Sequence, residues 1–359
     1  MSKENRRESM THKLAFIGFG VVGQGLAEIL HNKRQSLKEQ ESFDAKVVAI
    51  SDFKKGSLYH PDGLDLETVL DVVQKTGSLE NYPKTEGLVT GWNSLETIRQ
   101  SNADTVVEVS YTDVKTGQPA IDHCRAAFQS GKNVVMTNKG PVALAYQELS
   151  SLANKHNVSW GFEGTVMSGT PALRMPKLAL AGNDISEIRG ILNGTTNFML
   201  MRMDEGESYE SALKEAQKLG YAEADPTSDV EGLDARYKIV ILTQHVMGMP
   251  LSVEDVECTG ISQMTPELIE QARTEGKRWK LVATAKKENG VVSAKVAAEK
   301  VPLDDPLASV SGALNAITYE TDLLGPVTLS GAGAGKTETG FSLLIDLLTI
   351  AKAREAVRL

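Results

Sequence analysis

Residues 220–238 of the chain, GYAEADPTSDVEGLDARYK, combine the residue types best suited to chemistry. The pattern predicts a helix that begins near Ser228 or Asp229, because these residue types cap helix N-termini. Asp234 and Lys238 are separated by one helical turn and therefore share a face of that helix. The residues after Lys238 are mostly apolar, so the pair enters a core and must be mutually paired or used in function. The alternative is an exposed ion pair worth about 0.3–0.5 kcal/mol.

The order of acidic and basic residues in this stretch resembles the signature of the homoserine dehydrogenases. The segments that carry the resemblance are GYAEADP and GLDARYK. The resemblance implies that Glu223 and Asp234 bind the substrate's ammonium group and that Lys238 is the acid/base at the reacting oxygen. It also implies substrate contacts for Tyr221 and Asp229 and a cofactor contact for Gly220.

A glycine-rich segment near the N-terminus predicts a dinucleotide site. The apolar strand Leu14–Ile17 is followed at once by Gly18, Phe19, Gly20, Val21, Val22 and Gly23, and then by a helical pattern. In this strand–turn–helix setting, Gly18 permits the tight turn, Gly20 permits close approach of the pyrophosphate, and Gly23 permits close packing of helix on strand. The free N–H groups of the helix N-terminus would face the phosphates.

The choice between NAD and NADP is left open by the next strand. A strand over residues 46–51 ends at Asp52, where a Rossmann fold places the carboxylate that binds the adenosine ribose. This carboxylate favours NAD because it would repel a 2′-phosphate. Lys54 and Lys55 follow directly and could neutralise that phosphate, or they could be an ordinary solvated turn.

Alternation of strands and helices then continues, which indicates a doubly wound α/β domain. Strands are predicted at 105–108 and 133–136, with a helix at 118–129 between them. Ser110 and Lys139 follow the two strands, at the sheet edge where such folds bind ligands. The segment TNKGP also resembles that of the family, which implies that Lys139 lies beside substrate and nicotinamide. A solvated loop lysine is the alternative.

Two further turns resemble family sites. The strand 185–192 leads into Asn193-Gly-Thr-Thr-Asn197, where Gly194 and Thr195 would bind the carboxylate end of the substrate. The turn 163–171 would hold a monovalent cation, Na⁺, through oxygen donors of Glu163, Val166, Ser168 and Thr170. A plain turn that requires small residues explains this second segment equally well.

A second glycine-rich segment, SGAGAGKT at 330–337, is one residue short of a P-loop. A phosphoryl-transfer enzyme is therefore the hypothesis from a different class. The chain after Thr337 leaves no room for the strand that supplies the metal-binding aspartate. The segment instead resembles the family's terminal glycine-rich segment, which implies that Gly335 borders the cofactor.

Composition narrows the remaining possibilities. The net charge of −9 argues against nucleic acid and anionic membranes as partners. Cys124 and Cys258 stand in no motif, which is typical of buried thiols in a reducing compartment. No apolar run approaches the roughly 18 residues that span a bilayer. Residues 1–12 are charged and lack the apolar region of a secretory signal, so we expect a disordered tail and a cytoplasmic protein.

The sequence therefore predicts an α/β protein: a Rossmann NAD(P)-binding domain at 13–140, a substrate-binding and dimerisation domain at 141–325, and a segment at 326–359 that returns to the first domain. The alternating strand 291–301 should offer a flat apolar face to a dimer partner. The resemblance implies a short homoserine dehydrogenase without a regulatory domain, forming a homodimer or homotetramer. It would interconvert L-homoserine and L-aspartate 4-semialdehyde in threonine and methionine biosynthesis. The alternative within enzymes is a related NAD(P) oxidoreductase that acts on another amino acid.

Overall fold

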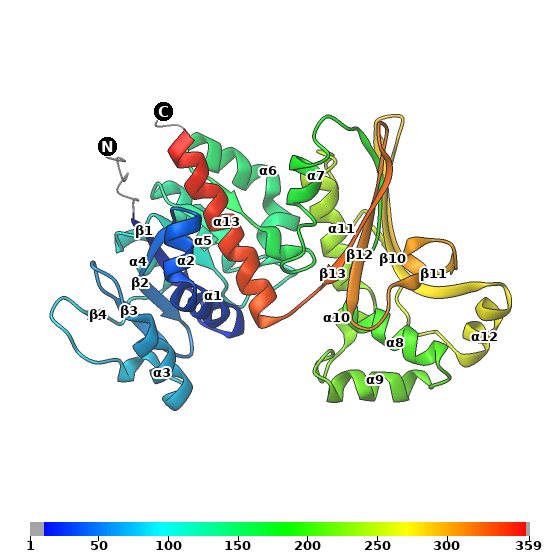
Figure 1. The fold of residues 1–359 in the computed structure, drawn as a ribbon, viewed down its shortest axis with the longest axis horizontal. Coiled ribbons are helices and arrows are strands. Elements are labelled where there is room, and N and C mark those ends of the chain that lie inside the picture. The colour runs from blue at the N-terminus through cyan, green and yellow to red at the C-terminus, as the bar shows by residue number, and fades with distance from the viewer. Residues whose placement is uncertain (1–10, 357–359) are drawn as a thin grey trace, which may run out of the picture. The chain divides into compact units, whose positions relative to one another are not determined.

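The structure is a computed structural model that describes residues 11–356 (Figure 1). The chain divides into two compact units. The first contains the chain up to residue 141, residues 145–164 and the segment from residue 336, and the second contains residues 142–144 and 165–335. The expected boundaries at 140 and 326 therefore differ from the observed ones. Residues 145–164 add a strand to the first sheet, and residues 326–332 pair within the second.

The first unit is built on a seven-stranded sheet in the order β4-β3-β2-β1-β5-β6-β7. Strands β2, β1, β5, β6 and β7 are parallel, as the doubly wound prediction requires, and β3 and β4 form an antiparallel edge. The strands are β1 (Thr11–Ile17), β2 (Asp44–Asp52), β3 (Gly56–Tyr59), β4 (Val89–Thr90), β5 (Thr105–Glu108), β6 (Asn133–Met136) and β7 (Trp160–Gly161). Of the expected disordered tail, residues 1–10 lie outside the described residues, whereas Thr11 and His12 already belong to β1.

Helices cover both faces of this sheet. Helix α13 lies beside α1, and together they bury a core that includes Leu14 and Phe16 (Figure 1). Helix α4 packs on β1 and β2, and α5 packs on β5 and β6. The helices of this unit are α1 (Val21–Asn32), α2 (Arg34–Gln40), α3 (Leu66–Thr76), α4 (Ser94–Gln100), α5 (Ala120–Gln129), α6 (Lys139–Lys155) and α13 (Lys336–Ala356). The final helix thus returns to the first unit, as expected.

The second unit is built on a six-stranded sheet in the order β13-β12-β8-β10-β11-β9. All neighbours are antiparallel except β9 and β11. The strands are β8 (Ile185–Ile191), β9 (Glu257–Cys258), β10 (Lys277–Glu288), β11 (Val291–Pro302), β12 (Leu314–Thr321) and β13 (Gly325–Ala332). The helices are α7 (Arg174–Leu178), α8 (Gly194–Asp204), α9 (Tyr209–Lys218), α10 (Thr227–Val230), α11 (Leu233–His245) and α12 (Pro266–Thr274).

Part of the apolar face of β11 is covered by the chain itself, whereas the expectation that this sheet contributes a dimer surface stays a prediction. Val296 is 1 % exposed and Ala294 is 8 % exposed. A Cβ atom added to Gly232, just before α11, would lie 3.0 Å from Val296 Cγ1. Helix α11 also packs on β8 and β10. The alternation that the sequence shows is real, but the chain's own helix covers part of the apolar side.

A buried lysine fastens the loop after residue 309 to α8. Lys280, near the start of β10, is 4 % exposed. Its Nζ donates to Asn197 Oδ1 at 2.9 Å and to the main-chain oxygen of Val310 at 2.5 Å. Asn197 donates in turn to the main-chain oxygens of Gly312 and Leu314. Burial, with a smaller contribution from Arg278, lowers the pKa of Lys280 to about 8.

We expect Lys280 to make the stability of the protein pH-dependent above neutrality. A lysine whose pKa is lower in the folded state than in the unfolded chain lowers stability below that pKa, and the penalty disappears as pH rises toward the unfolded value near 10.5. Relative to Lys280→Met, the wild type should therefore gain up to about 3 kcal/mol between pH 7 and pH 10.5. The measurement is the difference in Tm between the two proteins across this range. A constant difference would contradict a shifted lysine.

Candidate active site

The glycine-rich segment forms the turn between β1 and α1. Gly18 has φ 93°, and a Cβ atom there would lie 2.5 Å from the main-chain oxygen of Val109, so only glycine fits. A Cβ atom on Gly23 would lie 3.0 Å from the Gly18 oxygen, which is the close helix–strand approach predicted for it. A Cβ atom on Gly20 would meet none of the described residues within 4 Å. The open side of Gly20 is suited to a phosphate that approaches the backbone.

The side chains of the other residues in this turn differ in how far they are buried. The side chain of Phe19 is fully buried in the core, so it can contribute only main-chain atoms to a cofactor. Val22 packs partly buried against the same core, whereas Val21 is 65 % exposed. Helix α1 begins at Val21 without a side-chain cap. A helix N-terminus without such a cap can bind an anion through its N–H groups.

Asp52 fixes the turn after β2 to the glycine-rich segment. Its Oδ2 accepts the N–H of Phe19 at 2.7 Å, and its Oδ1 accepts the N–H groups of Lys54 and Lys55 at 2.9 Å each. Partial burial of the carboxyl group raises its pKa, but these three main-chain donors, with Lys55, outweigh burial and hold the pKa of Asp52 below its usual value. Lys54 is exposed. A negative charge is therefore built into the place where the adenosine ribose is expected.

The carboxyl ends of β5 and β6 bring Ser110 and Lys139 to the same edge of the sheet. Glu108 Oε1 accepts the N–H of Ser110 at 2.9 Å and the hydroxyl of Ser110 at 2.6 Å. It also accepts the side-chain amide of Asn138 at 2.8 Å. Lys139 is the first residue of α6. The sequence placed Ser110 and Lys139 here, but it gave no sign that Glu108 and Asn138 connect them.

In the second unit, Lys238 and Asp234 form the predicted pair on one helix face. Lys238 is 7 % exposed, and its Nζ donates to Asp234 Oδ2 and to the main-chain oxygen of Leu192, both at 2.6 Å. Asn193 Nδ2 donates to Asp234 Oδ2 at 3.1 Å and to Asp229 Oδ1 at 2.6 Å. The pair is therefore not an exposed surface ion pair. Asn193, which the sequence suggested only as part of a turn, links both acids.

The helix that carries this pair begins later than predicted. Ser228 and Asp229 lie inside the short helix α10, and α11 begins at Leu233 after Gly232. Gly232 has φ 77°, a left-handed conformation that interrupts the helix and that glycine adopts without strain. Asp229 consequently bonds Asn193 and does not cap α11.

The start of α8 and the loop after α9 are joined by Thr195. Its Oγ1 donates to the main-chain oxygen of Tyr221 at 2.6 Å. Gly194 and Thr195 lie in the first turn of α8, whose N-cap Asn193 accepts the N–H of Thr196. Glu223 is exposed, and its main-chain oxygen accepts an N–H of the Gln217 side chain. The structure thus joins two of the predicted substrate segments.

Local backbone conformation and contacts account for the residue types at Gly220 and in the turn 163–171, where a cation is expected. Gly220 follows the end of α9 with φ 76°, a conformation that favours glycine at a helix end. Met167 and Ser168 also have positive φ, and Thr170 Oγ1 donates to the main-chain oxygen of Ala332. Glu163 belongs to the first unit, whereas Val166, Ser168 and Thr170 belong to the second. Among the described residues, no group of three or more His, Cys, Asp and Glu side chains could hold a metal ion.

The segment at 330–337 is not a P-loop. Its strand, β13, is the antiparallel edge of the second sheet, whereas the helix that follows, α13, belongs to the first unit. Lys336 Nζ forms an ion pair with Glu28 Oε1 at 2.5 Å. A Cβ atom on Gly340 would lie 2.8 Å from the main-chain carbon of Gly25, so the glycines let α13 and α1 approach. Gly335, with φ 139°, begins the turn into α13.

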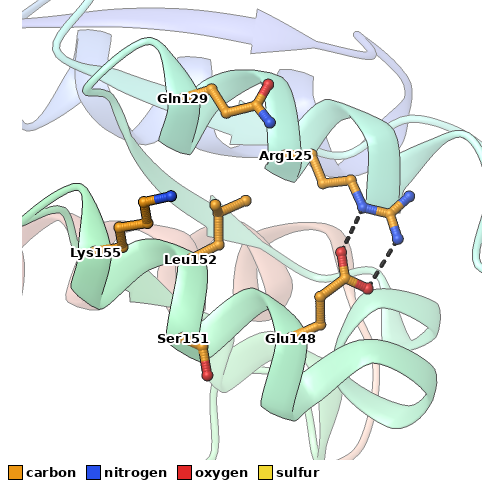
Figure 2. A pocket seen from close by; sticks show the side chains of 6 residues that line it. All are labelled: Arg125, Gln129, Glu148, Ser151, Leu152 and Lys155. Carbon is orange, nitrogen blue, oxygen red and sulfur yellow. Dashed lines mark hydrogen bonds and ion pairs between the residues drawn. The ribbon is translucent and has the colours of Figure 1, made fainter.

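The first unit also has a surface hollow between α5 and α6 (Figure 2). It is lined by Arg125, Gln129, Glu148, Ser151, Leu152 and Lys155. Arg125 donates to both carboxylate oxygens of Glu148, at 2.6 and 2.8 Å. Helices α5 and α6 run back from the carboxyl edge of the sheet, so these residues of their second halves lie toward the opposite edge. The hollow is not part of the candidate site.

Comparisons with known proteins agree with this geometry. The family model "Homoserine dehydrogenase" matches residues 171–348, and the model "Glutamate/Leucine/Phenylalanine/Valine dehydrogenase" matches residues 1–112. An NAD(+)-dependent homoserine dehydrogenase of Pseudomonas canavaninivorans is 44 % identical over 94 % of this chain and 96 % of its own length. A homoserine dehydrogenase of Methanocaldococcus jannaschii is also 44 % identical, over 94 % of this chain and 98 % of its own length.

Solved structures give the same result. A hyperthermophilic archaeal homoserine dehydrogenase in complex with NADPH is 30 % identical, with a TM-score of 0.81 over 96 % of this chain and 98 % of that one. A homoserine dehydrogenase from Thiobacillus denitrificans has a TM-score of 0.83 at 30 % identity, over 97 % of this chain and 74 % of that one. Together with the buried Lys238–Asp234 pair and the glycine-rich turn after β1, these likenesses establish that the chain belongs to the homoserine dehydrogenase family.

Proposed function

We propose that this chain interconverts L-homoserine and L-aspartate 4-semialdehyde with NAD(P), and that Lys238 moves the proton at the reacting oxygen. The observation that carries the role of Lys238 is its burial beside Asp234. A cation in a core is retained only when it is paired or used, and Asp234 and the Leu192 carbonyl hold its ammonium group in a fixed position. When bound, NAD(P) supplies or accepts the hydride at its nicotinamide ring.

The second unit also supplies groups for the two charged ends of homoserine. Asp234 and Glu223 are the acceptors for the substrate's ammonium group, and an ionised carboxylate can accept from several donors at once. The first turn of α8, with Gly194 and Thr195, provides the positive end of a helix for the carboxylate. Tyr221 and Asp229 support these groups, because the Tyr221 carbonyl accepts Thr195 Oγ1 and the Asp229 carboxylate accepts Asn193.

In the first unit, the cofactor would be held by the glycine-rich turn 18–23, Asp52, Ser110 and Lys139. Lys139 would also approach the reacting oxygen.

Three further proposals rest on resemblance. Two are cofactor contacts of Gly220 and Gly335, and the third is a Na⁺ site formed by Glu163, Val166, Ser168 and Thr170. Assembly into a homodimer or homotetramer also rests on resemblance, and light scattering of the purified protein would test it. Among the described residues, no helix has the length and apolar character needed to cross a membrane.

The activity is tested by following NADH or NADPH oxidation with L-aspartate 4-semialdehyde as substrate. Saturable oxidation that yields L-homoserine supports the proposal. Absence of turnover with both cofactors, in protein that is folded by circular dichroism, would overturn it.

We further propose that NAD is the preferred cofactor, because the ionised Asp52 would repel a 2′-phosphate. Asp52→Asn should then shift the ratio of kcat/KM for NADH over NADPH toward NADPH by roughly ten- to a hundredfold. The comparison of both cofactors in one variant separates the loss of repulsion from general damage to the turn, which would weaken NADH and NADPH alike. A ratio that stays unchanged would mean that Asp52 acts only as an anchor for the Phe19, Lys54 and Lys55 N–H groups.

A further inference from the structure

A buried polar network connects the two loops that follow β5 and β6. Glu108, the last residue of β5, is fully buried, and His123 of α5 is 3 % exposed. His123 Nδ1 lies 2.5 Å from Glu108 Oε2, and His123 Nε2 lies 2.8 Å from Ser94 Oγ. The other oxygen, Oε1, accepts all three donors from the loops, two on Ser110 and one on Asn138. One carboxylate therefore ties α5 and both loops together.

Asn138 links the start of α6 to the loop after β5. It is the N-cap residue of α6 and makes no side-chain cap there. Its Nδ2 donates to Glu108 Oε1 at 2.8 Å and to the main-chain oxygen of Ser110 at 3.0 Å. The first turn of α6 is thus fastened to the loop after β5 immediately before Lys139.

The same two loops also meet through glycines. A Cβ atom on Gly140 would lie 2.7 Å from Gly117 Cα, so the loop after β5 is in direct contact with the start of α6. Lys139 lies between Asn138 and Gly140 in the chain. Its main chain is therefore held by a hydrogen-bonded neighbour on one side and a tightly packed neighbour on the other.

We propose that Glu108 is a positioning residue for the reaction, which sets the main chain of Lys139 and the hydroxyl of Ser110 through its three bonds at Oε1. This proposal rests on the proposed function, in which Lys139 approaches the reacting oxygen. Misplacement of a catalytic group by about 1 Å can lower turnover by roughly a hundredfold, so loss of these bonds has a catalytic consequence. His123 holds the opposite oxygen and supports the fold without acting on Lys139.

The test compares the two sides of the same buried pair. Both Glu108→Ala and His123→Ala should lower Tm, and to a similar extent. Glu108→Ala should also lower kcat by roughly ten- to a hundredfold, whereas His123→Ala should change kcat by less than about threefold. Glu108→Gln should restore most of the activity, because its amide oxygen can accept the three loop donors while its NH₂ group faces a ring nitrogen of His123. Equal effects of Glu108→Ala and His123→Ala on kcat would overturn the proposal.

Asn138→Ala keeps the test informative if Glu108→Ala does not fold, because it removes one loop donor and leaves the buried pair intact. We expect it to lower kcat roughly tenfold. In a Lys139→Ala background, Asn138→Ala should have little further effect on kcat, and Glu108→Ala should lose the part of its effect that acts through Lys139. If Lys139→Ala itself leaves kcat unchanged, the proposed role of Lys139 fails. If Lys139→Ala lowers kcat but the other two effects simply multiply with it, the positioning role fails.

Discussion

Replacement of Lys238 by alanine should lower kcat by roughly 10²–10⁴ while NADH or NADPH binds with unchanged affinity. The reduction of an aldehyde requires a proton at the oxygen as hydride reaches the carbon. In the proposed function this proton comes from Lys238, whose buried ammonium group is held by Asp234 and the Leu192 carbonyl. Steady-state turnover, with cofactor affinity measured by fluorescence titration, gives the two quantities.

Lys132 provides the matched control for a buried lysine. It is 6 % exposed, and its Nζ donates to the main-chain oxygens of Ser101 and Ala103. Ser101 and Ala103 precede β5, and Lys132 precedes β6. All three therefore lie at the edge of the sheet opposite the carboxyl ends of the strands. Lys132→Met should lower Tm and leave kcat unchanged. If Lys238→Ala, in protein that is folded, behaves like Lys132→Met, then Lys238 serves stability and not proton transfer.

The parts of the site that were predictable from sequence depend on local chemistry. The turn 18–23 follows from three glycines between a strand and a helix, and Gly18 and Gly23 have their steric reasons within a few residues or just after the neighbouring strand. The Asp234–Lys238 pair follows from helical spacing. Ser110 and Lys139 follow from the rule that ligands bind at the carboxyl ends of parallel strands. In each case the sequence pattern and the structure express the same short-range constraint.

The residues that were missed act across long stretches of chain. Asn193 bonds acids 36 and 41 residues away, and Glu108 bonds Asn138 over 30 residues. Nothing in the local pattern distinguishes these side chains from ordinary turn or strand residues, because the sheet order brings them together. Strand β12 was missed for a related reason. It is paired on both sides and buried at most positions, so polar residues such as Asn315 and Thr318 lie in the sheet core, where the local pattern does not place them.

The late start of α11 has a different cause. Ser228 and Asp229 are good N-cap residues, and they do lie in a helix, but Gly232 interrupts it. A single glycine within an otherwise helical pattern is ambiguous from sequence, because glycine is tolerated in helices at modest cost. The consequence for the site is direct: the interruption allows Asp229 to bond Asn193 beside Asp234.

Replacement of Glu223 by glutamine should weaken kcat/KM for L-homoserine by roughly ten- to a hundredfold, largely through KM. Hydride transfer at an alcohol needs one acid/base, so the acids of this stretch are available to bind the substrate's ammonium group. A hydrogen bond to a charged group contributes roughly 1.5–3 kcal/mol, which corresponds to this loss. Asp225→Asn is the matched control. It makes the same change of charge in the same loop, but the Asp225 carboxylate is engaged by the N–H and hydroxyl of Thr227.

The substrate comparison separates ammonium binding from chemistry at Glu223. A primary alcohol analogue that lacks the amino group should be a poor substrate for the wild type, because the acids around Asp234 are then left without their cation. Glu223→Gln should weaken homoserine much more than this analogue, and Asp225→Asn should affect neither. If Glu223→Gln instead lowers kcat equally for both substrates and leaves both KM values unchanged, Glu223 takes part in the chemical step and is not an ammonium ligand.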